Sequence, residues 1–190
     1  MKIFISGFPG VGKTTLCKKI YESLKNKIKT VGFLTLEKRD KNKRIGFEIF
    51  LLHNGRRFTF ASKEKIGDKI YAGYYLNLEV LENAVDEVEK ELESANLLII
   101  DEIGKMEMES VRFKDFVEKI LKSEIPLIAT LHRAFIPKFK KFEILWLTRE
   151  NFNETYEKII EKLWAGSLVA KRPADNREIG SSNLPRPMGP

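Results

Sequence analysis

The sequence predicts an α/β fold in which a doubly wound, mainly parallel sheet carries an antiparallel hairpin insertion. Apolar strand-like segments alternate with amphipathic helical segments along most of the chain, the order typical of parallel sheets. Residues 97–100 form a continuous apolar run, as expected for a central strand that is buried on both faces. Asn54-Gly55 lies between two strand-like segments and predicts a two-residue hairpin there.

The first half of the chain gives these elements in order. A short apolar strand at residues 3–5 precedes a helix over residues 13–25, whose apolar side chains recur every four residues. A strand follows at residues 30–36. Alternating apolar residues from Ile45 to Leu51 predict the next strand, and the Asn54-Gly55 hairpin joins residues 47–53 to residues 56–61.

The second half continues the alternation. Asn77 is expected to cap a helix that reaches residue 94, and a further helix spans residues 110–122. Strands are predicted at residues 125–130, with Pro126 at the entry, and at residues 142–148. Asn151 and Glu154 have the spacing of a capping box and predict the start of a last helix, which ends near residue 164.

Length and composition indicate one domain over residues 1–165, which is long enough for a full hydrophobic core. Four of the seven prolines lie after residue 165, where apolar periodicity also stops. We therefore expect residues 166–190 to be a disordered or vector-derived tail.

The single cysteine, Cys17, excludes an intrachain disulfide and favours a cytoplasmic location. No apolar run approaches the length of a membrane span, and the start of the chain leaves no room for a signal peptide. We expect no membrane partner. The sequence leaves the oligomeric state open, a monomer included.

Residues 7–14 fit the phosphate-loop pattern G-x-x-x-x-G-K-[ST]. The residues are Gly7, Phe8, Pro9, Gly10, Val11, Gly12, Lys13 and Thr14, and Thr15 follows. The strand before the pattern and the helix after it provide the context that such a loop needs. Its backbone N–H groups would surround phosphate oxygens, Lys13 would reach the β- and γ-phosphates, and Thr14 would bind Mg²⁺. The pattern therefore predicts binding of a nucleoside triphosphate.

Two carboxylates, Asp101 and Glu102, end the apolar strand at residues 97–100. A phosphate-loop enzyme needs a carboxylate at such a strand end to hold Mg²⁺, so Asp101 is the second predicted metal residue. Glu102 is the predicted catalytic base for an attacking water, together with Lys13 as the catalytic cation. Gly104 and Lys105 follow after Ile103 and are candidate nucleotide contacts, although Lys105 is either a phosphate contact or a solvated cation.

The formal charge of +7 raises the question of a nucleic-acid partner. The densest basic cluster flanks a predicted turn at Asp40 and Asn42, where a solvated hairpin tip explains it better, so a nucleic-acid partner is disfavoured but open. Hydrolysis also needs a cation for the transferred phosphoryl group. Candidates are Arg39, Arg44, Arg133 and Arg149. His53 and His132 lack the spacing of a zinc site.

Several segments together resemble the THEP1-type nucleoside-triphosphatases, called cancer-related nucleoside-triphosphatases in animals. These segments are residues 7–15, 32–33, 44–47, 75–79, 101–107, 129–130 and 147–151. The resemblance implies a RecA-like phosphate-loop fold and Mg²⁺-dependent hydrolysis of ATP, GTP, CTP, UTP and TTP. It also implies that Gly7–Thr14 bind the phosphates, that Thr14 and Asp101 bind Mg²⁺, and that Glu102 is the base. Phe152 is a departure, since family members often have a basic residue at that position.

Two other functions are considered. The first is a small-molecule or polynucleotide kinase, in which residues 138–142 would serve as a lid, but these residues lack the paired-arginine signature of such lids. The second is a nucleic-acid-stimulated ATPase, which the net charge and the RecA-like plan suggest.

Overall fold

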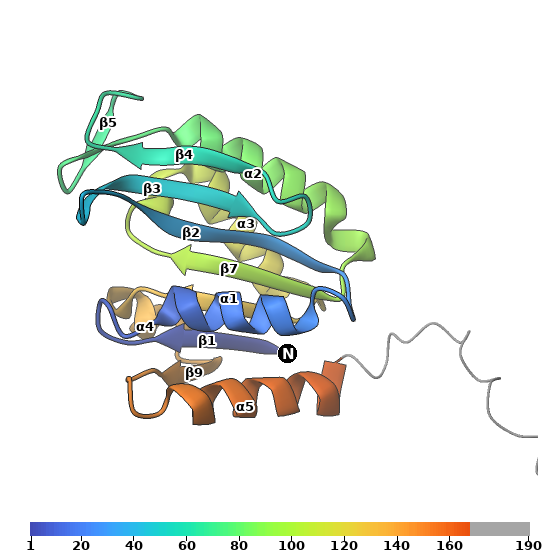
Figure 1. Cartoon of the computed structure of the whole chain (residues 1–190). Coiled ribbons are helices and arrows are strands. Elements are labelled where there is room, and N and C mark those ends of the chain that lie inside the picture. The colour runs from blue at the N-terminus through green and yellow to red at the C-terminus, as the bar shows by residue number, and fades with distance from the viewer. Residues whose placement is uncertain (168–190) are drawn as a thin grey trace, which may run out of the picture.

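The computed structural model describes residues 1–167. These residues form a nine-stranded sheet in the order β5-β6-β4-β3-β2-β7-β8-β1-β9, with helices packed against it (Figure 1). The predicted α/β architecture is confirmed. The predicted tail, residues 166–190, lies outside the described residues except for Gly166 and Ser167, which end a π-helical turn, η4 (Leu163–Ser167).

Five neighbouring strands make the parallel half of the sheet. They are β1 (Lys2–Ser6), β2 (Thr30–Asp40), β7 (Leu97–Ile103), β8 (Leu127–Leu131) and β9 (Glu143–Trp146). β1 lies between β8 and β9, and β7 lies between β2 and β8. Their carboxyl ends therefore meet at one edge, which is where ligands bind in sheets of this type.

The antiparallel half extends the sheet from β2 through β3 (Lys43–Leu51), β4 (Arg57–Ser62), β6 (Tyr74–Leu76) and β5 (Lys69–Tyr71). β2 runs four residues beyond the predicted end at residue 36, because it pairs with β3 as far as Asp40. Lys41 and Asn42 form the turn with φ angles of 42° and 65°. The predicted hairpin tip is confirmed, while the small β5–β6 hairpin has no counterpart in the prediction.

The prediction of a two-residue hairpin at Asn54-Gly55 is wrong. The backbone of Leu51 pairs with Arg56, so four residues separate the paired positions. The N–H of Gly55 donates to the carbonyl of Leu51 at 2.9 Å, and the Asn54 side chain accepts from the N–H of Arg56 at 3.0 Å. These bonds close a longer turn, which a dipeptide signal alone does not distinguish from the two-residue form.

Helices cover both faces of the sheet (Figure 1). α1 (Lys13–Leu24) and α5 (Phe152–Lys162) pack on one face, and α2 (Leu78–Glu91) and α3 (Val111–Lys122) pack on the other. Along β7, Leu97 and Ile99 belong to the core between the sheet and α1 and α5. Leu98 and Ile100 belong to the core on the opposite face, under α2 and α3. The prediction that residues 97–100 are buried on both faces is confirmed. Short helical turns complete the fold: η1 (Leu92–Ser94), η2 (Glu107–Glu109), η3 (Arg133–Phe135) and α4 (Ile136–Phe139).

The two predicted helix caps have different outcomes. The side chain of Asn77 accepts a hydrogen bond from the N–H of Val80 at 3.2 Å, as expected of a cap. The capping box of Asn151 and Glu154 is wrong, because Asn151 makes no side-chain cap to α5. Its amide instead accepts from the N–H of Thr148 at 2.8 Å and donates to the carbonyl of Trp146 at 2.9 Å. Asn151 therefore closes the loop between β9 and α5.

Within residues 1–167, no helix has the length and apolar character needed to cross a bilayer.

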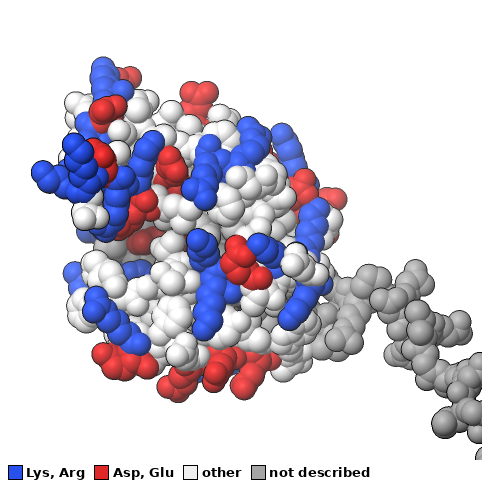
Figure 2. Space-filling view, viewed as in Figure 1, with Lys and Arg blue, Asp and Glu red and all other residues white. Residues whose placement is uncertain are grey.

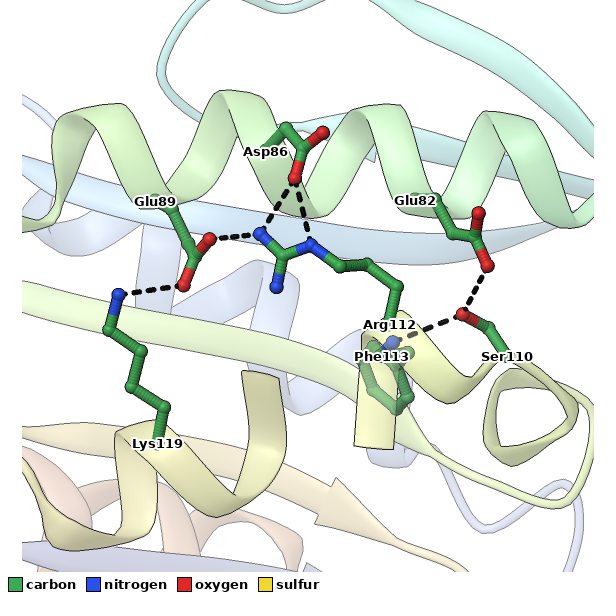
Figure 3. A network of polar contacts seen from close by, with 7 residues as sticks. All are labelled: Glu82, Asp86, Glu89, Ser110, Arg112, Phe113 and Lys119. Atoms are coloured by element: carbon green, nitrogen blue, oxygen red, sulfur yellow. Dashed lines mark hydrogen bonds and ion pairs between the residues drawn. The ribbon is translucent and has the colours of Figure 1, made fainter. Parts of the chain in front are cut away.

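A polar network joins α2 to α3 on the face away from α1 (Figure 3). Arg112 donates to Asp86 at 2.6 Å and also to Glu89, which accepts a second hydrogen bond from Lys119 at 2.9 Å. Ser110 caps α3 through the N–H of Phe113 and donates to Glu82 at 2.8 Å. Burial of Glu89 raises its pKa, but the bonds from Lys119 and Arg112 outweigh this and lower it.

Glu89→Gln is expected to lower the free energy of unfolding by about 1 kcal/mol at pH 7. The pKa of Glu89 is lower in the folded than in the unfolded protein, so its carboxylate stabilises the fold above the unfolded pKa. This contribution is lost as the pH falls through the folded pKa. Urea unfolding of both proteins should therefore show a difference at pH 7 that shrinks on acidification. Glu157→Gln, on the exposed face of α5, is the control, and an equal loss there would contradict the assignment.

Candidate active site

A cavity of about 630 Å³ opens at the carboxyl ends of the central parallel strands. Its walls come from the loop between β1 and α1, the end of β7, the turn after β8, and the β2–β3 hairpin. Figure 2 shows a hollow in the surface below the Lys- and Arg-rich end of that hairpin. The lining includes Gly7, Pro9, Gly10, Gly12, Lys13, Thr14, Thr15, Asp101, Glu102, Gly104 and Lys105. The fold thus brings most of the predicted site residues into one cavity.

The loop between β1 and α1 is held in a closed curve by Lys13. Its ammonium group donates to the carbonyls of Gly7 at 3.2 Å and Phe8 at 3.3 Å. Gly12 has a φ angle of 102°, which favours glycine, and α1 begins at the next residue. The first N–H groups of α1 have no partner in the helix and carry partial positive charge. This end of α1 is therefore suited to a phosphate group.

Gly7 is constrained by the neighbouring strand. A Cβ atom at this position would lie 2.5 Å from the carbonyl oxygen of Leu147, which follows β9. Because that atom belongs to the backbone, it cannot turn away as the end of a side chain could. Gly10, by contrast, has nothing within 4 Å of its Cβ position.

Asp101 is the buried acid of the site, with only 1% of its surface exposed. One carboxylate oxygen accepts a hydrogen bond from the Thr130 hydroxyl at 2.6 Å, and the other oxygen, Oδ2, has no partner. Burial raises the pKa of Asp101 to about 6 and the charge of Glu102 adds to this rise, while the hydroxyls of Thr130 and Thr14 and the charge of Lys13 oppose it. A buried oxygen without a partner, close to the Thr14 hydroxyl, fits a bound divalent cation.

Two more acids lie at the same edge. Burial raises the pKa of Glu102, and the nearby charge of Lys13 opposes the rise. Glu107 is 5% exposed, and burial together with the charges of Glu102 and Asp101 raises its pKa to about 8. At pH 7 Glu107 is therefore mostly protonated and adds little negative charge to this edge.

The remaining candidates divide between the cavity and its surroundings. Phe8 and Val11 occupy variable positions of the loop and do not line the cavity. Arg39, Arg44 and Arg133 line it, whereas Arg149 does not. The two hairpin arginines are both paired with Glu37, at 2.5 Å for Arg39.

Sequence reasoning missed three residues of this site. Thr130 was noted only as part of a matching segment, yet it supplies the hydrogen bond to Asp101. Glu107 belongs to the selective segment at residues 101–107, which was the available signal. Glu37 has no signal in the sequence, because its bond to Arg44 depends on pairing across the hairpin.

The family model for NTPase matches residues 2–160. The chain belongs to this family. Among curated NTPases, the nucleoside-triphosphatase THEP1 of Methanocaldococcus jannaschii is 45% identical over 87% of this chain and 99% of its own length. The enzyme of the same name from Pyrobaculum islandicum is 41% identical over 86% of this chain and 93% of its own length.

Solved NTPase structures agree with this assignment. The crystal structure of THEP1 from Aquifex aeolicus superposes with a TM-score of 0.72 at 33% identity, covering 86% of this chain and 99% of that one. The solution structure of a human cancer-related nucleoside triphosphatase superposes with a TM-score of 0.69 at 28% identity, covering 87% and 98%. The predicted family resemblance and the phosphate-loop NTPase fold are both confirmed.

Gly7→Ala is expected to lower the free energy of unfolding by about 2–3 kcal/mol, because the new methyl group must push β1 from the backbone after β9. Gly10→Ala is the matched control in the same loop. Its φ angle of 77° costs about 1 kcal/mol but its Cβ meets no neighbour. Thermal and urea unfolding of the two variants compare them. A larger loss for Gly10→Ala would contradict the contact with Leu147.

Proposed function

We propose that this protein hydrolyses nucleoside 5′-triphosphates to nucleoside diphosphate and phosphate with Mg²⁺. One observation carries the proposal: a buried carboxylate with a free oxygen, Asp101, shares a cavity with the phosphate loop and with a second acid, Glu102. The family to which the chain belongs supports the same reaction class. A cytoplasmic location is also proposed, on the single buried cysteine.

Thr14 and Asp101 are the proposed Mg²⁺ residues. The described residues contain no group of three His, Cys, Asp or Glu side chains that could hold a metal ion. A site of one hydroxyl and one carboxylate is completed by phosphate oxygens and water, as is usual for Mg²⁺ in nucleotide enzymes. When bound, the ion supplies positive charge to the β- and γ-phosphate oxygens. Asp101 is ionised above its pKa of about 6 and can serve as a ligand at neutral pH.

Lys13 and Glu102 have separate roles in the proposed reaction. Lys13 exchanges its loop carbonyls for the β- and γ-phosphate oxygens. Glu102 orients a water and takes its proton as the water oxygen bonds to the γ-phosphorus and the bond from that phosphorus to the bridging oxygen breaks. A raised pKa suits Glu102 to this work, because a base is most effective when its pKa lies near the working pH. Gly104 and Lys105 are proposed nucleotide contacts at the same edge.

A second candidate function, phosphoryl transfer to an acceptor, rests on the shape of the cavity. Beyond the phosphate loop the cavity continues to a wall formed by Thr35, Glu37, Phe47 and Tyr71. Such a space could hold an acceptor in place of water. Hydrolysis is preferred because Glu102, which follows the metal residue directly, can activate water without an added substrate.

Incubation with Mg²⁺ and each of ATP, GTP, CTP, UTP and TTP should release phosphate with no acceptor present. A cavity that holds the phosphates through backbone groups discriminates little between bases, so we expect rates within about tenfold of one another. Phosphate release is measured by a coupled colour assay, with and without chelator. Strict dependence on an added hydroxyl compound would favour the kinase, and a large stimulation by single-stranded DNA or RNA that salt abolishes would favour the nucleic-acid-dependent ATPase.

Glu102→Gln should keep nucleotide affinity and reduce turnover by roughly 10²–10⁴-fold, because the amide cannot accept the proton. Affinity is measured by calorimetry with a non-hydrolysable triphosphate, and turnover by phosphate release. Glu118→Gln, an exposed change on α3, serves as the control. Unchanged turnover in Glu102→Gln would remove Glu102 from its proposed role.

A further inference from the structure

Arg133 differs from the other arginines that line the cavity because, among the described residues, it forms no ion pair with an acid. It begins the η3 turn after β8 and lines the cavity beside the phosphate loop. Within residues 1–167 its guanidinium forms no ion pair, and its one ring contact is with Phe8, at 5.3 Å from the guanidinium carbon to the ring centroid. An arginine without a counterion beside a phosphate loop is free to bind an anion there.

The guanidinium of Arg133 rests on Phe8, whose ring contacts Trp146. Phe8 is 55% exposed and Trp146 is 41% exposed, which is unusual for large apolar side chains. Their rings meet edge to face at 5.5 Å, and the guanidinium of Arg133 covers Phe8. A cation held on an aromatic ring keeps its hydrogen-bond donors available, because the contact uses the face of the guanidinium rather than its N–H groups.

The backbone around Arg133 is fixed to both halves of the site. The Ser6 hydroxyl, next to the phosphate loop, donates to the carbonyl of Leu131 at 2.9 Å. The N–H of His132 donates to the carbonyl of Ile103, two residues after Asp101, at 3.1 Å. The turn that carries Arg133 is therefore tied to the strand before the phosphate loop and to the strand that carries the acids.

The other arginines near the site lack this combination. Arg39 and Arg44 line the cavity, but Glu37 binds both of them and neutralises part of their charge. Arg149 follows β9 and does not line the cavity. Lys105 lines it, but an ammonium group cannot offer the planar pair of donors that matches two phosphoryl oxygens.

We infer that Arg133 is the catalytic arginine, supplied by the chain itself, that binds the γ-phosphoryl oxygens in the transition state. This inference rests on the proposed hydrolysis. As the bond to the bridging oxygen breaks and the water oxygen approaches, negative charge spreads over the transferred group and the leaving oxygen. Arg133 moves from Phe8 to these oxygens and donates two N–H bonds to them. Phe8 is a positioning residue, which holds the guanidinium beside the loop before the reaction.

Arg133→Ala should reduce kcat on the order of 10³-fold, the lower end of the range for such arginines, with KM changed less than threefold. Arg133→Lys should recover part of the rate. The second readout is binding of nucleoside diphosphate with Mg²⁺ and aluminium fluoride, which mimics the planar phosphoryl group. Calorimetry should show that Arg133→Ala binds the diphosphate normally but loses the additional affinity that aluminium fluoride gives the unaltered protein.

Arg57→Ala is the matched control, because Arg57 also stacks on a phenylalanine, Phe50, at 5.1 Å but lies outside the cavity. It should hydrolyse triphosphate at the rate of the unaltered protein. Phe8→Leu should lower kcat about tenfold with KM preserved, and Phe8→Tyr, which keeps the aromatic face, should restore it.

The outcomes separate this inference from the proposed function. If the unaltered protein releases no phosphate from any triphosphate, the proposed hydrolysis fails. If it does release phosphate and Arg133→Ala keeps kcat within threefold, the assignment of Arg133 is overturned. Equal loss of diphosphate and aluminium-fluoride binding would also overturn it, because Arg133 would then act in ground-state binding. A loss of kcat in Arg149→Ala or Arg44→Ala without one in Arg133→Ala would move the role to that arginine.

Discussion

The burial of the Asp101 carboxylate is the constraint on which the site depends. A charged group at 1% exposure is costly unless it is hydrogen-bonded or paired. Here Thr130 satisfies one oxygen and the other is left for a ligand, and the raised pKa of Asp101 records the remaining cost. Asp101 thus connects two parts of the structure. The apolar core around β7 buries its carboxylate, and Thr14 and Lys13 of the phosphate loop oppose the resulting rise in its pKa.

The arrangement of strands explains why these groups meet. β1, β8 and β7 are parallel neighbours, so the phosphate loop, the η3 turn and the acids all follow strand ends at one edge. Side-chain and backbone hydrogen bonds from Ser6 and His132 then fix the three segments to one another. Under the proposed function, this fixed backbone limits the rearrangement on phosphate binding to side chains such as Lys13 and Arg133, and preorganisation of this kind favours electrostatic stabilisation of a transition state.

The structure of the β2–β3 hairpin shows that its basic residues are partly paired with an acid. Its arginines look like an exposed basic cluster in the sequence, but Glu37 binds Arg39 on its own strand and Arg44 across the antiparallel pair. Part of the charge is therefore compensated within the hairpin, which weakens the case for a polyanion partner. The hairpin instead supplies a wall of the cavity, to which Phe47 of β3 and Tyr71 of β5 add aromatic surface.

Two local sequence patterns gave wrong predictions, because residues in them form hydrogen bonds that the pattern does not include. Asn151 and Glu154 have capping-box spacing, but the amide of Asn151 binds the loop after β9 instead, because the Trp146 carbonyl and the Thr148 N–H lie within its reach. In the longer turn at Asn54-Gly55, the side chain of Asn54 accepts from the N–H of Arg56 and also donates to Glu87 of α2. Such choices depend on groups that the neighbouring strand brings together.

The sequence by itself determined the phosphate loop, the strand buried on both faces, the acids at its end and the family. These features can be recognised from short stretches of sequence, because a glycine-rich loop, an apolar run and a helical period are local properties. Only the tertiary structure decided which arginines are neutralised, which oxygen of Asp101 is free, that Thr130 donates to Asp101, and that Glu107 and Arg133 line one cavity. Those facts depend on distances between segments far apart in the chain, which the packing of the sheet sets and no local pattern encodes.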